Sequence, residues 1–191
     1  MKFIQIPTSE ELEKELKREQ YKTKYRKTLR STVFILITAA AAAVLVAMLW
    51  LPVLQIYGAS MTPTLQEGQI VVSLKGGRYE TGDIIAFYYG NKLLVKRYIA
   101  GPGSWVDIRE DGSVSVDGVV LEEPYLTEKS LGNCDLTLPY QVPEGKYFLM
   151  GDHRETSVDS RHSSVGCIGE DAIVGRIVYR IWPLETMGAV S

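Results

Sequence analysis

The chain is 191 residues long, with 46% hydrophobic residues, 23% charged residues and a formal net charge of -2. This composition excludes a largely disordered chain. Residues 52–191 carry twelve Lys and Arg against eighteen Asp and Glu, so they lack the concentrated basic face that a nucleic-acid partner requires. Their length suits one compact domain.

The first 30 residues are polar and end in a basic cluster. They hold nine Lys and Arg against five Asp and Glu, and the mixture of charges is typical of a helix. No acidic residue interrupts the final cluster, which consists of Lys22, Lys24, Arg26, Lys27 and Arg30. Because basic residues that flank a membrane span stay on the cytoplasmic side, we expect residues 1–30 to be a cytoplasmic segment.

The next segment has the length of a membrane span. No charged residue occurs from residue 31 to residue 66, and the apolar section Val33–Leu51 is 19 residues long. Pro52 disfavours helical geometry in the residue before it, so the expected transmembrane helix covers residues 31–51. A cleaved secretory signal is the alternative, but its apolar region is usually shorter. The sequence therefore predicts a single-pass protein of the cell membrane, with residues 52–191 outside the cytoplasm.

From Gln69 onward, short apolar or alternating runs are separated by turn residues, which is the pattern of β-strands. Strands are expected at Gln69–Leu74, Asp83–Tyr89, Leu93–Ala100, Trp105–Ile108, Ser113–Val116, Val119–Leu121, Lys146–Met150 and Ile173–Trp182. No long amphipathic helical pattern lies among them. We therefore predict a mainly β fold, an antiparallel or barrel-like sheet domain over residues 52–191 on one N-terminal transmembrane helix. Residues 131–144 are expected to be irregular or disordered.

A turn-rich segment directly after the span holds Ser60, a candidate nucleophile. An isolated serine in a linker is more often a solvated hydroxyl, so another group must activate it. A Ser-His-Asp arrangement would use His153 or His162 together with Asp152 or Asp159. That alternative stays open at this point.

Lysine offers a second route, because burial lowers the pKa of an amine and allows it to act as a general base. Strand alternation places Leu94, Lys96 and Tyr98 on one face and Arg97 on the other. One of the two cations must then point toward apolar side chains, and periodicity does not say which. A lysine whose amine reaches solvent from a strand edge is the alternative.

The segment from Met150 to Arg161 packs opposite charges and hydroxyl groups directly after an apolar strand. Such a segment suits a turn held by ion pairs, for example Asp159 with Arg161, or Asp152 with Arg97. A purely structural role is an equally valid interpretation of it.

Four sequence boxes occur in a fixed order along the chain. They are Ser60-Met61-x-Pro63-Thr64-Leu65, Gly82-Asp83-Ile84-Ile85, Lys96-Arg97-x-x-x-Gly101, and Gly151-Asp152-x-Arg154-x-x-Ser157-x-Asp159-Ser160-Arg161. Together with the membrane span, this order resembles that of bacterial type I signal peptidases, in particular the single-span Gram-positive form.

The resemblance implies roles for seven residues. Ser60 would be the nucleophile and Lys96 the general base, while Ser157 would hydrogen-bond the lysine amine and orient it. The supporting residues would be Asp159, Arg161, Arg97 and Asp152.

The oxyanion hole would rest on the Ser60 backbone N–H and the region of Gly58. Some members of the family have a serine at the position of Gly58, and its hydroxyl lines the hole. We expect Gly58→Ser to be tolerated because it restores that donor, and Gly58→Val to crowd the site.

The function implied is that of a serine endopeptidase that removes N-terminal signal peptides from secretory preproteins after small residues, of the Ala-X-Ala type. No cofactor or metal is implied. Ser60 lies nine residues beyond Leu51, so it stands within ~30 Å of the end of the span, close to the lipid bilayer. Two alternatives are a self-cleaving, repressor-like Ser/Lys peptidase, which would not need the span, and a catalytically silent tethered binding domain, which would not need the dyad.

Cys134 and Cys167 are the only cysteines, and both fall on the oxidising side of the membrane. A disulfide between them is therefore a possibility that their spacing cannot decide. Together with His153 and His162 they lack any recognised metal-ligand spacing, so no metal site is expected.

Overall fold

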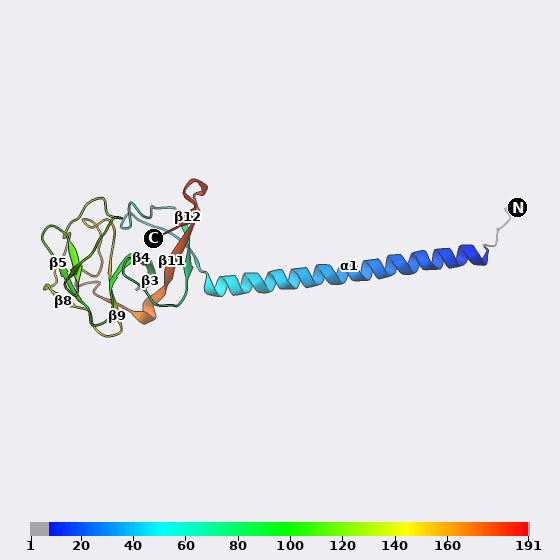
Figure 1. Cartoon of the computed structure of the whole chain (residues 1–191), viewed down its shortest axis with the longest axis horizontal. Coiled ribbons are helices and arrows are strands. Elements are labelled where there is room, and N and C mark those ends of the chain that lie inside the picture. The colour runs from blue at the N-terminus through cyan, green and yellow to red at the C-terminus, as the bar shows by residue number, and fades with distance from the viewer. Residues whose placement is uncertain (1–7, 191) are drawn as a thin grey trace. The chain divides into compact units, whose positions relative to one another are not determined.

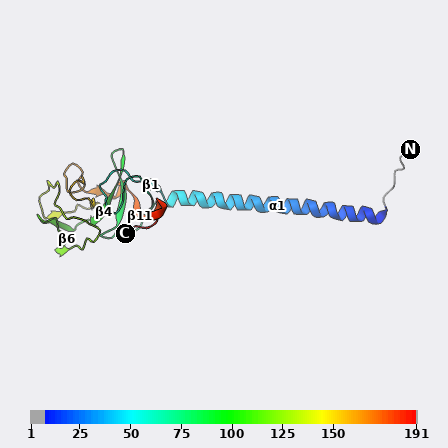
Figure 2. The same cartoon turned by 90° about the horizontal axis from the view of Figure 1, so that it is seen from above.

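The computed structural model describes residues 8–190. The chain forms two compact units, with the boundary between Ala47 and Met48. From Ser9 onward the first unit is helical, and the second contains all of the strands of the described residues (Figures 1 and 2). The expected boundaries at residues 30 and 51 remain predictions, since the helix runs through both segments without a break.

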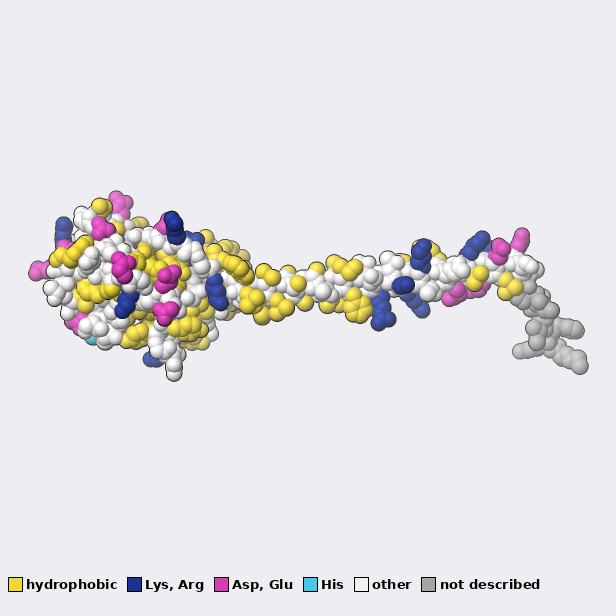
Figure 3. Space-filling view, turned by 90° about the horizontal axis from the view of Figure 1, so that it is seen from below, with side chains coloured by type: hydrophobic (Ala, Val, Ile, Leu, Met, Phe, Trp, Pro, Cys, Tyr) yellow, Lys and Arg dark blue, Asp and Glu magenta, His cyan; other side chains and the backbone are white. Residues whose placement is uncertain are grey.

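Helix α1 spans Ser9–Trp50, and none of its residues is buried. Charged side chains gather toward its N-terminal part, while apolar side chains dominate further along (Figure 3). At ~1.5 Å per residue, the uncharged part from Ser31 to Trp50 is ~30 Å long, the thickness of a hydrocarbon core. The helix is long and apolar enough to cross a membrane. The hydroxyl of Thr38 donates to the Phe34 carbonyl at 2.8 Å, so this polar group is satisfied within the helix.

The larger sheet has eight strands, and every pairing in it is antiparallel. The strands follow the order β1-β2-β11-β3-β4-β9-β10, and β12 pairs with β11. Their bounds are β1 Val53–Gln55, β2 Ile70–Leu74, β3 Ile84–Tyr89, β4 Lys92–Ala100, β9 Lys146–Met150, β10 Ile168–Gly169, β11 Ile173–Trp182 and β12 Gly188–Ala189. Two short 3-10 helices, η1 Glu170–Ala172 and η2 Leu184–Thr186, precede and follow β11.

The smaller sheet has four antiparallel strands in the order β7-β6-β5-β8. Their bounds are β5 Trp105–Ile108, β6 Val114–Val116, β7 Val119–Val120 and β8 Tyr140–Gln141. The inner side chains Val106, Ile108 and Val114 pack with Ile99 and Phe148 of the larger sheet in one buried cluster. The two sheets therefore share a core.

The predicted fold class is confirmed, and all eight expected strands form with ends that agree within about one residue. The sequence missed β1, β8, β10 and β12, which have two or three residues each and lack the Asp117-Gly118 hairpin turn that marks the equally short β6 and β7. Strand β8 lies inside residues 131–144. The rest of that stretch is irregular, yet Leu131, Leu136 and Leu138 pack against the core, so the expectation of disorder there is wrong.

Strand β4 carries the site and is packed on both faces. One face meets Ile85, Phe87 and Leu149, and the other meets a second buried cluster that includes Ile84 and Met61. Along its edges, β3 pairs with β4 from Lys92 to Arg97, whereas β9 pairs only from Arg97 onward. The edge of β4 before Arg97 is therefore open toward a further strand.

Candidate active site

Ser60 and Lys96 are joined by a hydrogen bond of 2.6 Å between the hydroxyl oxygen and the amine nitrogen. Ser60 stands in the connection between β1 and β2, and Lys96 comes from β4. The serine segment is a tight turn, in which the Thr62 N–H donates to the Ala59 carbonyl at 3.1 Å and the Leu65 N–H to the Met61 carbonyl at 2.9 Å. The hydroxyl is thus presented on a hydrogen-bonded backbone.

Lys96 is the cation that faces apolar side chains. It lies opposite Ile85 on the β4 face that packs against the cluster of Phe87, Tyr98 and Leu149, and only 4% of it is exposed. Burial, only partly offset by the charge of Asp159, lowers the pKa of Lys96 to about 8. With this pKa about a tenth of the amine is neutral at pH 7, and the neutral form is the one that a general base requires.

Arg97 is also buried, but its guanidinium is paired with a carboxylate. Of the two neighbouring cations, Lys96 is therefore the one that faces apolar side chains without such a partner among residues 8–190. Its guanidinium donates to both carboxylate oxygens of Asp152 at 2.9 and 2.7 Å and to the Gly82 carbonyl at 2.6 Å. Thr64, in the serine segment, donates to the same carboxylate at 2.5 Å. This one ion pair therefore connects the strand of Lys96, the segment of Ser60 and the turn that begins at Gly151.

The turn after β9 touches Ser60 directly. The His153 N–H donates to the Ser60 carbonyl at 3.1 Å. A Cβ on Gly151 would come within 3 Å of both the Ser157 side chain and the Ser60 carbonyl oxygen. Glycine at position 151 is what allows the turn to lie against the serine.

Asp159 and Arg161 form the second buried ion pair of the turn. The guanidinium of Arg161 donates to both Asp159 oxygens at 2.9 Å and also to the carbonyls of Leu131 and Arg154, each at 2.8 Å. The Gly151 N–H donates to Asp159 at 2.8 Å. Burial by itself would raise the pKa of Asp159, but the hydrogen bonds and charge of Arg161 lower it below its ordinary value.

Ser157 differs from the expectation. Its hydroxyl is buried and makes no hydrogen bond of good geometry within residues 8–190, although it lies close enough to the Asp159 carboxylate to help lower the pKa of that group. The expected bond to the Lys96 amine is not formed. The hydroxyl lies beside Gly151 and the Ser60 carbonyl, where the close packing of the turn holds it. The lysine amine is bonded instead to Ser60.

The sequence did not reveal a buried layer of side chains that covers the ion pairs. This layer comes from the connection between β7 and β8. The ring of Tyr125 lies over the Arg97 guanidinium, with 3.7 Å from the ring centre to the guanidinium carbon. Tyr125 donates to Glu123 at 2.8 Å, and Glu123 pairs with Arg154. Glu123 and Arg154 are 31 residues apart in sequence, so no local pattern could have identified their contact.

Neither histidine ring bonds to Ser60. The ring of His153 is hydrogen-bonded to Thr156 at 2.8 Å, and that of His162 to Ser164 at 2.7 Å. The structure therefore does not contain the Ser-His-Asp arrangement that the sequence left open. Cys134 and Cys167 are free thiols, and no group of three or more His, Cys, Asp or Glu within residues 8–190 is arranged to hold a metal ion.

Gly58 has a φ angle of 81°, a conformation that L-residues with side chains rarely adopt. No atom lies within 4 Å of a Cβ placed there, so space is not the constraint. Any side chain at this position would strain the backbone, which counts against the expected tolerance of Gly58→Ser; turnover of that variant is the measurement that tests the expectation. The same strain, rather than crowding, applies to Gly58→Val.

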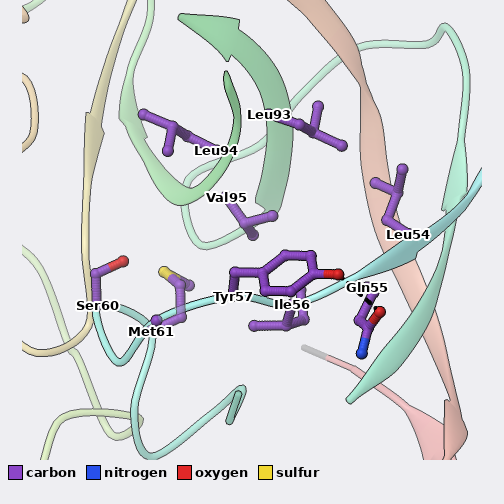
Figure 4. A pocket seen from close by; sticks show the side chains of 10 residues that line it. Leu54, Gln55, Ile56, Tyr57, Ser60, Met61, Leu93, Leu94 and Val95 are labelled. Atoms are coloured by element: carbon purple, nitrogen blue, oxygen red, sulfur yellow. Dashed lines mark hydrogen bonds between the residues drawn. The ribbon is translucent and has the colours of Figure 1, made fainter. Parts of the chain in front are cut away.

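Two pockets share Ser60 and Leu94 in their walls, and they are named the β1 arm and the hairpin arm. The β1 arm is narrow, about 40 Å³, and is lined by Leu54, Gln55, Ile56, Tyr57, Gly58, Ser60, Met61, Leu93, Leu94 and Val95. Figure 4 shows Val95 directed toward the segment from Ile56 to Met61, with Leu93 and Leu94 on opposite sides of their strand. The hairpin arm is wider, about 490 Å³, and is lined by Ser60, Tyr89, Asn91, Lys92, Leu94, Lys96, Val158 and Val165.

Gly151→Ala tests the close approach of the turn. We expect the added methyl group to displace the Ser60 segment and to lower turnover about a hundredfold, the usual cost of a displacement of ~1 Å at reacting groups. Gly188→Ala is the matched control, because its Cβ would meet no atom within 4 Å. Steady-state kinetics of both variants decide the matter, and wild-type turnover in Gly151→Ala would contradict the proposed contact.

Comparison with known proteins gives a consistent result. Residues 29–182 match the family model described as signal peptidase, peptidase S26. The chain is 37% identical over 150 residues to signal peptidase IB of Staphylococcus aureus strain COL, covering 68% of this chain and 77% of that protein. It is 36% identical over 167 residues to signal peptidase I of Bacillus amyloliquefaciens, covering 80% and 84%.

A crystal structure of a signal peptidase I from Enterococcus faecalis V583 is 30% identical in sequence. The structural match covers 52% of this chain and 97% of the Enterococcus chain, with a TM-score of 0.43. The family match extends over most of the chain and includes all four sequence boxes. The chain therefore belongs to the signal peptidase family, peptidase S26, and is a serine peptidase that processes signal peptides.

Proposed function

We propose that the chain is a membrane-anchored endopeptidase that releases exported preproteins from their signal peptides by means of a Ser60/Lys96 dyad. The observation that carries this proposal is the bond of 2.6 Å between Ser60 and a buried lysine that forms no ion pair within residues 8–190. In such a site the neutral amine accepts the hydroxyl proton, and the serine oxygen becomes a nucleophile.

The reaction proceeds in two steps. The Ser60 oxygen attacks the carbonyl of the scissile bond while Lys96 takes its proton, and the resulting ammonium returns that proton to the departing amine of the mature protein. Water, deprotonated by the same lysine, then hydrolyses the acyl-enzyme and releases the signal peptide. The buried hydroxyl of Ser157 can donate toward the Asp159 carboxylate and is the group that we assign to accept a hydrogen bond from the ammonium.

The backbone N–H of Ser60 is the proposed oxyanion donor. It donates no hydrogen bond to another group within residues 8–190, so it is available to the carbonyl oxygen on which negative charge develops. The left-handed conformation of Gly58 places the chain for this approach. Arg97, Asp152, Asp159 and Arg161 act by holding the three segments together.

The β1 arm accounts for a preference for small residues. Both strands that border it, β1 and the first half of β4, have an unpaired edge, so the signal peptide can lie between them as an added strand. Alternate side chains of such a strand enter the arm. With about 40 Å³ of free space lined by Ile56, Met61 and Val95, the arm suits the two alanines of an Ala-X-Ala sequence.

The uncharged part of α1 is the proposed membrane anchor. Its exposed apolar side chains require lipid around them, and the basic cluster that precedes it retains the N-terminus in the cytoplasm. Residues 52–191 then lie outside, where exported preproteins emerge. The proposed partners are secretory preproteins and the lipid bilayer.

Cleavage of a purified preprotein by the detergent-solubilised chain tests the dyad. Ser60→Ala and Lys96→Ala should each remove nearly all activity while the thermal unfolding temperature stays close to that of the wild type. The double variant should be little worse than either single one, because the members of one proton-transfer unit are not additive. Full activity of Lys96→Ala would eliminate the lysine as base.

The pH dependence of cleavage follows from the pKa of Lys96. The active form is the neutral amine, so the rate should rise with pH through about 8 and fall about tenfold for each pH unit below it. Rates of one peptide substrate between mildly acidic and alkaline pH give the profile. A rate that does not change between neutral and mildly acidic pH would exclude Lys96 from this role.

Topology is tested with protease added to intact spheroplasts. The proposed orientation exposes residues 52–191, so they should be digested while a tag at the N-terminus survives until lysis. Protection of the β-domain together with digestion of the tag would reverse the orientation.

A further inference from the structure

The hairpin arm shares its walls with the amine of the proposed general base. Leu94 and Lys96 lie on one face of β4, and both line this arm. Leu93 and Val95 point to the opposite face, which borders the β1 arm and packs against the cluster that contains Ile56 (Figure 4). Lys96 does not line the β1 arm. Of the two arms, the amine therefore faces only the hairpin arm.

The walls of the β1 arm fix the direction in which a signal peptide lies in it. Residues 54–58 line it before Ser60 on one segment, and residues 93–95 line it before Lys96 on the other. In the proposed function, the end of the signal peptide occupies this arm and the cleaved bond lies at the dyad. The signal peptide therefore runs parallel to β4, and the mature chain continues past Arg97.

Alternation along the bound peptide then directs the residue X of Ala-X-Ala to the other face. The two alanines point into the β1 arm, so the residue between them points the opposite way. On that face the open edge of β4 borders the hairpin arm, where Leu94, Val158 and Val165 supply apolar surface. With about 490 Å³ against about 40 Å³ in the β1 arm, the hairpin arm accepts a large side chain.

The side chain of X then lies close to the amine of Lys96. Neighbouring strands are ~4.8 Å apart and two residues cover ~7 Å along a strand, so the two side chains begin ~5–8 Å apart. At this distance a carboxylate at X stabilises the ammonium form and raises the pKa of the amine by about one to two units. A cation at X has the opposite effect.

The fold itself supplies no carboxylate in this arm. No Asp or Glu of the described chain lines it. The ionisable groups that face the amine are Asp152, Asp159 and Arg161 of the turn after β9, Tyr89 of β3, and Lys92 and Tyr98 of β4 itself. The three groups of the turn are held in buried ion pairs, and Lys92 is exposed, so water and salt screen its charge. A carboxylate at X would therefore act mainly on the buried amine.

We propose that the hairpin arm receives the side chain of X and that an acidic X binds the protonated enzyme unproductively. Such a signal peptide is held more tightly at neutral pH and is cleaved more slowly, because its carboxylate stabilises the ammonium form of Lys96. The inference rests on the proposed function, since it takes the Ser60/Lys96 dyad as the place of cleavage.

The test uses the full-length enzyme in a neutral detergent and peptide substrates that share one signal peptide. The residue X is Gln, Glu or Lys. A control set keeps Gln at X and carries Glu or Lys at the eighth mature position, beyond both arms. The measured quantities are kcat and KM for each substrate, from mildly acidic to alkaline pH.

For Glu at X, we expect the inflection of kcat against pH to lie about one to two pH units above that for Gln. At neutral pH, kcat and KM should both be lower by about tenfold or more, while kcat/KM stays close to that for Gln. The reason is that kcat/KM follows the free enzyme, whereas kcat follows the bound complex. At alkaline pH, where Lys96 is neutral with either substrate, the two kcat values should converge. Lys at X should move the inflection the other way.

A second measurement tests the place of X independently of charge. Val158 lines only the hairpin arm and is 55% exposed, so Val158→Trp narrows this arm from its outer wall. We expect the variant to lower kcat/KM for Phe at X about tenfold more than for Gly at X. Val119→Trp is the matched control, since Val119 is 68% exposed and lines neither arm.

Four results would overturn the inference. They are the same kcat profile for Glu and Gln at X, an equal shift with Glu at the eighth mature position, an equal loss for Phe and Gly at X in Val158→Trp, and a shift that disappears in Lys92→Gln. The last result would assign the effect to the exposed cation. Failure of the proposed function looks different, because the wild type would then cleave none of the peptides faster than Ser60→Ala does.

Discussion

The candidate site depends on the burial of Lys96, which forms no ion pair with any carboxylate among residues 8–190. Desolvation disfavours the ammonium, and the amine is hydrogen-bonded to the hydroxyl of Ser60, the proposed nucleophile. A direct carboxylate partner would raise the pKa again and remove the base. Asp159 is instead hydrogen-bonded to Arg161 and to the Gly151 N–H. Its charge therefore raises the pKa of Lys96 by less than burial lowers it.

The buried arginines around the dyad keep this arrangement rigid. Three of them, Arg97, Arg154 and Arg161, are almost fully buried, and each has a carboxylate partner that is buried as well. Buried ion pairs add little net stability, but removal of one partner costs about 3–5 kcal/mol because the other charge is left unpaired. Their geometry is therefore well determined. Each also bonds to backbone carbonyls or to segments distant in sequence, which holds the loops that carry Ser60 and Ser157 in register with β4.

The smaller sheet contributes to the site through the connection that leaves it. Glu123 and Tyr125 lie on that connection and close over Arg154 and Arg97. Burial next to Glu123 raises the pKa of Tyr125, so the phenol stays protonated and continues to donate to that carboxylate. Through this connection, the smaller sheet helps to exclude water from the ion pairs that position Ser60 and Lys96.

The sequence by itself predicted an apolar helix of membrane-spanning length, the longer strands and, through the ordered boxes, the proposed pairing of Ser60 with Lys96. An uncharged run of helical length, period-two alternation and ordered boxes are local patterns, which can be recognised without the fold. Only the tertiary structure shows that Arg97 rather than Lys96 has a carboxylate partner, because alternation separates the two cations but does not reveal that Asp152, 55 residues away, pairs with the arginine. It also decided that Ser157 turns toward Gly151 and that Gly58 is left-handed, since both depend on how the turn after β9 packs against the serine segment. The contact of Glu123 with Arg154 was likewise hidden, because contacts between distant segments exist only after the chain has folded.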